Sequence, residues 1–189
     1  NSTVKAVDNH LANYRIPESA RALQEFVDDM SNWYVRRSRE RFWAKDMPQD
    51  KINAYMTLYT ALVTISKAAA PLIPFMTEEI YQNLVRSVDA SAPESIHLCD
   101  YPEVCEEWID PELEANMKEL LKIVVLGRAC RNAANLKNRQ PLGNMYVKAP
   151  AALPELYRNI IEEELNVKQM EFVDALDNFI TYTFKPQLK

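Results

Sequence analysis

The sequence predicts a mainly α-helical bundle with a small α/β appendix at its C-terminal end, and three observations support this fold class. Apolar residues recur at helical spacing through most of residues 1–142. Only two of the 189 residues are glycine, which leaves little scope for the tight hairpins of an all-β fold. After residue 142 the pattern changes to short alternating runs typical of strands. We therefore expect a helical bundle over 1–142 and an appendix over 143–189.

Prolines divide the predicted bundle into helices. A short helix over residues 2–14 precedes one that begins at Pro17, since proline is tolerated in a first helical turn. Pro48 interrupts the pattern, and the next helix ends near Pro71. Another helix follows Pro74. In the helix after Pro48 we expect the inner side to carry Ile52, Tyr55, Met56, Tyr59, Leu62, Val63 and Ser66.

The helix that begins at Pro17 has an apolar face that turns cationic. Its stripe consists of Leu23, Phe26, Val27, Met30, Trp33 and Tyr34. Extended at about 3.6 residues per turn, the same face meets Arg37 and Arg41. Burying an unpaired guanidinium is costly, so these arginines need carboxylates, phosphates or water. We expect Trp33 to lie in the core, whereas Trp43 is either a plug between helices or a platform for a base.

A long helix from about Asp110 repeats this change of character. Leu113, Met117, Leu120 and Val124 line one face, which continues into Gly127 and Arg131. Glycine at the junction allows another backbone to come close. Residues 122–139 hold five basic residues and no acid. The preceding connection, 89–111, contains Trp108, which we expect to anchor it on the bundle.

The C-terminal appendix has the pattern β-α-β-β. We predict strands over 145–149, 167–173 and 179–184, a helix over 153–165 and a turn at Asp177-Asn178. About 45 residues are too few for a substantial core, so the appendix should pack on the bundle.

Composition excludes several classes of function. There is no apolar run of about 18 residues, which argues against a membrane helix. Three cysteines without a Cys-x-x-Cys pair argue against a metal centre or disulfide framework and favour a reducing, cytoplasmic setting. We expect no catalytic residue and no metal site. The first residues lack an initiator methionine, so we expect a piece of a longer chain. The net charge of −5 is unpromising for RNA binding, but residues 31–48 and 122–139 are basic windows on an acidic body.

Five stretches resemble the anticodon-binding region of class I isoleucyl-tRNA synthetases, in the same order. They are Asn32–Trp43, Pro71–Tyr81, Ser95–Pro102, Arg131–Leu142 and Glu163–Lys168. The Arg-Arg-Ser-Arg, Ser-Ile-His-Leu and Arg-Gln-Pro-Leu runs favour the isoleucyl branch, while the Pro-Phe-Met-Thr-Glu-Glu run is shared with valyl and leucyl enzymes.

This resemblance implies a fragment that binds and orients isoleucine-specific tRNA, with no active site and no cofactor of its own. The nucleotide motifs of the family, which serve ATP and magnesium in the full-length enzyme, do not occur here. The catalytic domain of the same chain would be a second partner. The candidate tRNA-binding residues are Arg36, Arg37, Arg39, Arg41, Trp43, Arg128, Arg131, Asn135, Lys137 and Arg139. Two alternatives remain: the same domain of a valyl or leucyl enzyme, or a helical interaction module that docks its basic faces on an acidic partner.

Overall fold

A computed structural model describes residues 1–175 and confirms a mainly α-helical fold with a small α/β part. The chain forms two compact units, which divide between residues 109 and 110. The predicted strand 179–184 and the turn at Asp177-Asn178 lie outside the described residues. Within residues 1–175, no helix is both long enough and apolar enough to cross a bilayer.

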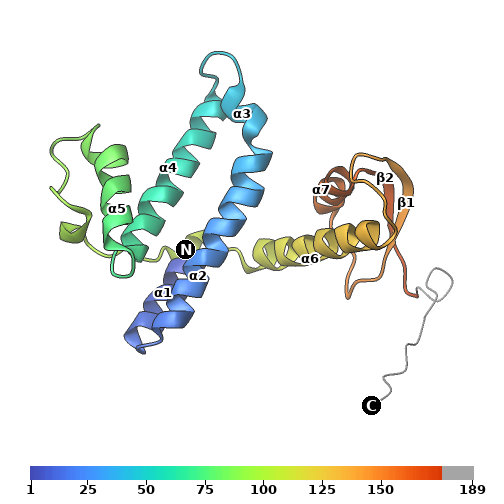
Figure 1. Ribbon diagram of the computed structural model, residues 1–189, viewed down its shortest axis with the longest axis horizontal. Helices are drawn as coiled ribbons and strands as arrows, with labels where there is room; N and C mark the ends of the chain where they lie inside the picture. Colours follow the sequence, from blue (N-terminus) through green and yellow to red (C-terminus); the bar gives the residue numbers. More distant parts are fainter. Residues whose placement is uncertain (176–189) are drawn as a thin grey trace. The chain divides into compact units, whose positions relative to one another are not determined.

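The first unit is built on a helical hairpin (Figure 1). One arm consists of α2 (Ile16–Asp29), a π-helical turn (Met30–Val35) and α3 (Arg39–Trp43). The other arm is α4 (Gln49–Ala69). The short α1 (Ser2–Ala12) packs against α2 and α4, and α5 (Pro74–Tyr81) packs against α4 and continues into a second π-helical turn (Gln82–Arg86). The helix bounds fall at the predicted prolines.

The buried side chains of α4 are mostly small ones, rather than the large ones that were predicted. Ala54, Ser66, Ala68 and Ala69 are buried, and Val7, Leu23 and Ile65 complete the core at the base of the hairpin. Tyr55, Met56 and Tyr59 are 44%, 55% and 37% exposed, so their predicted burial was wrong. Apolar spacing alone did not reveal that short side chains let neighbouring helices come close enough to leave the larger ones outside.

The connection after α5 is anchored by Ile96, not by Trp108. Ile96 is 3% exposed and packs with Tyr81 and Ala70. It opens a 3-10 turn over Ile96–Leu98, and a second such turn covers Glu106–Trp108. Trp108 is 73% exposed, which makes the predicted anchor wrong. The Tyr81 hydroxyl donates a hydrogen bond to the Pro93 carbonyl at 2.9 Å and fixes the connection a second time.

Glu78 joins α5 to the same connection. One oxygen accepts hydrogen bonds from the Ser95 hydroxyl at 2.8 Å and from the Ile96 N–H at 3.0 Å. The other accepts from the Gln82 amide at 2.7 Å. Hydrogen bonds from Gln82 and then Ser95 lower the pKa of Glu78 below its usual 4.5.

This lowered pKa predicts a loss of stability in acid. The contribution of the Glu78 carboxylate to the free energy of unfolding is fully present above the unfolded-state pKa. It is lost as pH falls through the lower folded-state pKa. We expect the melting temperature to fall between pH 6 and pH 3 by less in Glu78→Gln than in the wild type, as measured by circular dichroism. Glu94→Gln, an exposed neighbour on the connection, is the control and should follow the wild type. An unchanged acid dependence in Glu78→Gln would contradict the assignment.

The second unit contains α6 (Pro111–Ala133), β1 (Leu142–Val147), α7 (Glu155–Leu165) and β2 (Val167–Phe172). Asp110 caps α6 by accepting a hydrogen bond from the Leu113 N–H at 2.9 Å. The strands pair in parallel, Leu142 opposite Val167 and Val147 opposite Phe172, with α7 as the crossover. The appendix therefore packs on α6, a helix that the sequence analysis assigned to the bundle.

Candidate nucleic-acid interface

The π-helical turn before α3 changes which side of the helix faces inward. A π turn contains one residue more than an α turn, so the buried stripe shifts by one position after it. Ser38 is 5% exposed, whereas Arg37 is exposed. The prediction that the core face runs into Arg37 was therefore wrong. Ser38 takes the buried position, and Arg37 lies on the surface.

Arg41 binds a carboxylate on the opposite arm of the hairpin. Its Nε and Nη2 donate to the two oxygens of Asp50, each at 2.8 Å. This fork-to-fork geometry lowers the pKa of Asp50. Phe42 lies beside it, 5.1 Å from the Tyr55 ring and 6.4 Å from the Tyr34 ring between centroids. Arg41 therefore fixes the end of the hairpin, so its guanidinium is already engaged and is a weaker candidate for tRNA contact.

Trp43 lies at the end of α3 and is 75% exposed, so it is not a plug between helices. The guanidinium of Arg39 lies 5.3 Å from its ring centre, within the range of a cation–π contact. One turn earlier the pattern repeats, with the Arg36 guanidinium 5.7 Å from the centre of Trp33, which is half-buried rather than a core residue. The two exposed arginines are thus held against indole rings on the surface of one arm.

Arg131 is the least exposed of the predicted binding residues, at 4%. Its guanidinium donates hydrogen bonds to four carbonyl oxygens, those of Lys137 at 3.0 Å, Gln140 at 3.0 Å, Leu165 at 2.6 Å and Asn166 at 3.2 Å. Leu165 and Asn166 end α7, where helix dipoles concentrate negative partial charge. Arg131 is therefore a structural residue, and its assignment as a phosphate ligand is corrected.

The chain leaves α6 through a Schellman motif. Asn135 takes the left-handed conformation, with φ of 53°. The Leu136 N–H donates to the Arg131 carbonyl at 2.9 Å and the Asn135 N–H to the Asn132 carbonyl at 3.1 Å. A turn follows at once, closed by a 3.0 Å bond from the Gln140 N–H to the Lys137 carbonyl. Asn135, Lys137 and Arg139 are exposed on this segment.

Arg128 and Gly127 join α6 to α7. Arg128 forms a 2.7 Å ion pair with Glu164, whose side chain is 3% exposed. The position of a β-carbon on Gly127 would lie 2.4 Å from the Leu165 side chain. The predicted close approach at Gly127 is thus made by a leucine side chain rather than by a backbone. Arg128 is partly committed to Glu164, which weakens its candidacy for RNA contact.

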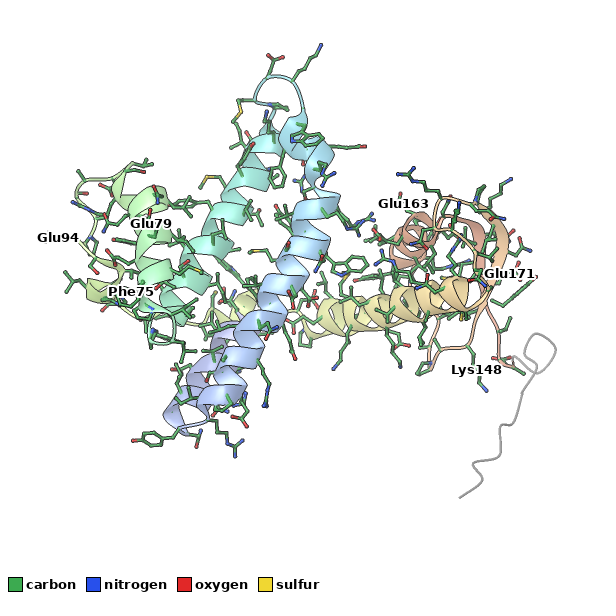
Figure 2. The ribbon with its side chains drawn as sticks, viewed as in Figure 1. Phe75, Glu79, Glu94, Lys148, Glu163 and Glu171 are labelled. Carbon is green, nitrogen blue, oxygen red and sulfur yellow. The ribbon has the colours of Figure 1, made fainter. Side chains whose placement is uncertain are left out.

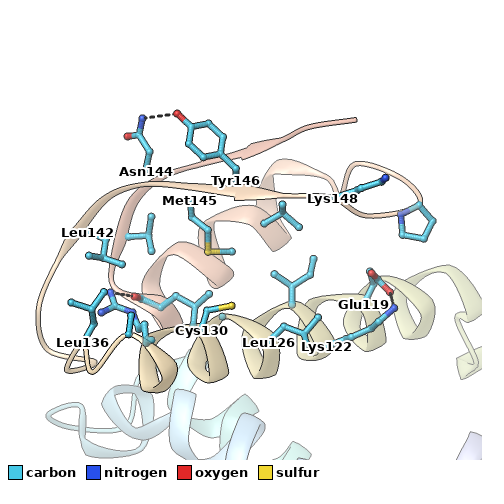
Figure 3. A pocket seen from close by; sticks show the side chains of 18 residues that line it. Glu119, Lys122, Leu126, Cys130, Leu136, Leu142, Asn144, Met145, Tyr146 and Lys148 are labelled. Carbon is cyan, nitrogen blue, oxygen red and sulfur yellow. Dashed lines mark hydrogen bonds and ion pairs between the residues drawn. The ribbon is translucent and has the colours of Figure 1, made fainter. Parts of the chain in front are cut away.

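An apolar cavity of about 560 Å³ lies between α6 and β1 (Figure 3). Leu126 and Cys130 of α6 and Met145 of β1 line it, and Glu119 pairs with Lys122 at 3.4 Å at its margin. A second apolar feature is at the surface of the first unit, where Phe75 at the start of α5 is 91% exposed (Figure 2). Three cationic residues, Lys122, Arg131 and Lys148, are among those that line the cavity. Lys122 is paired with Glu119, and Arg131 donates to backbone carbonyls.

The structure thus gathers the predicted residues on two separate elements. Arg36, Arg37, Arg39 and Trp43 lie on the α2–α3 arm, and Asn135, Lys137 and Arg139 follow α6. Asn166 was not among the predicted residues, and its side-chain amide donates to the carbonyls of Asn138 at 3.3 Å and Arg139 at 3.0 Å. A signal was available, because asparagine directly after a helical pattern is a common left-handed cap, and its φ is 50°.

Comparison with known proteins identifies the family of the chain. Residues 1–146 match the family model described as the anticodon-binding domain of tRNA ligase. The chain is 52% identical over 188 residues to the isoleucine–tRNA ligase of Clostridium tetani and 53% identical over 188 residues to that of Clostridium acetobutylicum, in each case over 100% of this chain. It is 43% identical to the Thermus thermophilus enzyme over 98% of the chain. The chain spans 18% of the length of each of these relatives. It belongs to the family of anticodon-binding domains of tRNA ligases.

Proposed function

We propose that this chain is the anticodon-binding region of an isoleucine–tRNA ligase and that it binds and orients isoleucine-specific tRNA. The observation that carries the proposal is the 52–53% identity to isoleucine–tRNA ligases over the whole chain. The relatives named above share this specificity, which favours it over a valyl or leucyl enzyme. Amino-acid activation, with ATP and magnesium, belongs to the catalytic domain of the longer cytoplasmic enzyme.

Exposed groups of two kinds support RNA as the partner. Arg36, Arg37 and Arg39 carry the charge that attracts phosphate, and Trp43 offers an aromatic face. Arginine contacts to phosphate set the register of an RNA, while stacking holds unpaired bases such as those of an anticodon loop. The alternative, docking on an acidic protein, uses the arginines but gives no role to an exposed indole among them.

Direct binding tests the proposal. The 189-residue chain should bind a fluorescent isoleucine tRNA transcript saturably at about 0.1 M salt, where partly screened charges still attract phosphate, and should prefer it to a valine transcript. The measurement is fluorescence anisotropy. Binding that is absent, or that is equal for every polyanion tested, would contradict the proposed function and favour the acidic-partner alternative.

Trp43 gives a sharper prediction within the same assay. If a base stacks on it, Trp43→Ala should weaken tRNA binding by about 1–3 kcal/mol, the range for one base on one aromatic ring. Stability should change little, because the side chain is 75% exposed. Trp108→Ala is a matched control, since this tryptophan is 73% exposed but follows Glu106 and Glu107. Equal affinity of the two variants would rule out Trp43 as a base platform.

A further inference from the structure

The turn over residues 137–140 has every one of its carbonyl groups held from inside the second unit. Arg131 donates to the carbonyls of Lys137 and Gln140, the first and last residues of the turn. The Asn166 amide donates to the carbonyls of Asn138 and Arg139, the two central residues. Two side chains therefore hold all four acceptors of the turn.

Holding the carbonyls inward determines what the turn offers to solvent. Carbonyl oxygens repel phosphate, whereas the side chains of Lys137, Asn138 and Arg139 are exposed. Among residues 1–175, no backbone acceptor takes the N–H groups of Asn138 and Arg139, and no ion pair takes up Lys137 or Arg139. The outer side of the turn thus presents donors and positive charge, which is the complement of a phosphate group.

The residues that hold the turn are themselves fixed by hydrogen bonds to the end of α7 and the start of β1. Leu165 and Asn166, at the end of α7, bind the same Arg131 guanidinium through their carbonyls, and the Asn166 carbonyl also accepts the Leu142 N–H at 3.0 Å where β1 begins. Asn166 can do this because its left-handed backbone, φ of 50°, turns both its amide and its carbonyl toward the turn and the strand. The geometry of the turn is therefore fixed before any ligand arrives.

We infer that the turn 137–140 is a preformed site for the sugar–phosphate backbone of RNA, with Lys137 and Arg139 as its ligands and Asn166 and Arg131 as positioning residues. This inference rests on the proposed function, because it assigns the RNA to tRNA. The two kinds of residue have different roles. Lys137 and Arg139 attract the RNA backbone by their charge, and Asn166 lowers the conformational entropy that the turn loses on binding.

Salt dependence of tRNA binding by the full 189-residue chain tests the assignment. Lys137→Ala and Arg139→Ala should each weaken binding about fivefold at 0.15 M salt and lower the slope of log affinity against log salt by about one. Asn166→Gly keeps the left-handed backbone and removes only the amide. It should weaken binding about two- to tenfold and leave the slope unchanged, because no charge is lost.

Asn159→Ala, an exposed asparagine on α7, is the matched control and should bind as the wild type does. The inference is overturned if Lys137→Ala and Arg139→Ala keep the wild-type slope, or if a folded Asn166→Gly keeps the wild-type affinity. Both charge variants lie at exposed positions, so they remain informative even if Asn166→Gly melts early. If the inference is overturned but the wild type still prefers isoleucine tRNA, the proposed function is retained. If the wild type shows no such preference, the proposed function itself is contradicted.

Discussion

Arg131→Ala is expected to lower the free energy of unfolding by about 3–5 kcal/mol, the largest effect of any single substitution considered for this chain. The guanidinium is buried and satisfies four carbonyls. A hydrogen bond to a charged group contributes roughly 1.5–3 kcal/mol, and acceptors left without a donor add a desolvation cost. Among residues 1–175 no ion pair compensates the charge, so the carbonyls of the turn 137–140 and of the end of α7 stabilise it.

Urea denaturation followed by circular dichroism measures this effect. Arg139→Ala removes the same side chain from an exposed position eight residues later and should change stability by no more than about 0.5 kcal/mol. Arg131→Lys should lie between the two, since one ammonium cannot reach four acceptors in the fork geometry of a guanidinium. A loss of less than about 1 kcal/mol in Arg131→Ala would show that the carbonyls find other donors or water.

Leu165→Ala is expected to cost about 2–5 kcal/mol, as for other leucines removed from packed interiors. Leu165 is 2% exposed and lies against Gly127 of α6. The reverse change, Gly127→Leu, places new atoms where the Leu165 side chain already lies, 2.4 Å from the position of a β-carbon. Such overpacking typically costs about 1–3 kcal/mol.

The two changes should compensate when combined. In Gly127→Leu with Leu165→Ala, the leucine moves from α7 to α6 and the total side-chain volume rises by only one methyl group, so the double variant should be less destabilised than the sum of the single ones. A double-mutant cycle in urea gives this coupling energy directly. Gly143→Ala is the control, because no atom lies within 4 Å of its β-carbon position. Strict additivity would mean that α6 and α7 do not pack through this pair.

The helix limits were predictable from the sequence because proline acts locally. Pro17, Pro48, Pro71 and Pro74 act through the fixed φ of the ring and the missing N–H, which do not depend on the rest of the fold. The strands around α7 were predicted within a few residues for the same kind of reason, since alternation reflects a local pleat.

The inward side of each helix was less predictable, because it depends on contacts made far along the chain. The π-helical turn over Met30–Val35 shifts the stripe from Arg37 to Ser38, and periodicity at a fixed spacing cannot detect it. Arg131 illustrates a second limit. Its position on a core stripe indicated that the guanidinium needs a partner. The acceptors are backbone carbonyls, two of them 34 and 35 residues later in the chain. Every residue has a backbone carbonyl, so the residue types of the sequence do not show which ones accept.

The first unit has its two ends tied together. The Asn1 side chain accepts a hydrogen bond from the Cys105 N–H at 3.0 Å, and Lys5 pairs with Glu106 at 2.7 Å. The chain therefore enters and leaves this unit at one point of its surface. A module with neighbouring ends can be transplanted into a surface loop of a host protein, or re-cut at the exposed residues 45–48 with its old ends joined by a short linker, without stretching its core. In the transplanted form the hairpin and its arginine–tryptophan contacts would be kept, whereas the re-cut form opens the loop between α3 and α4.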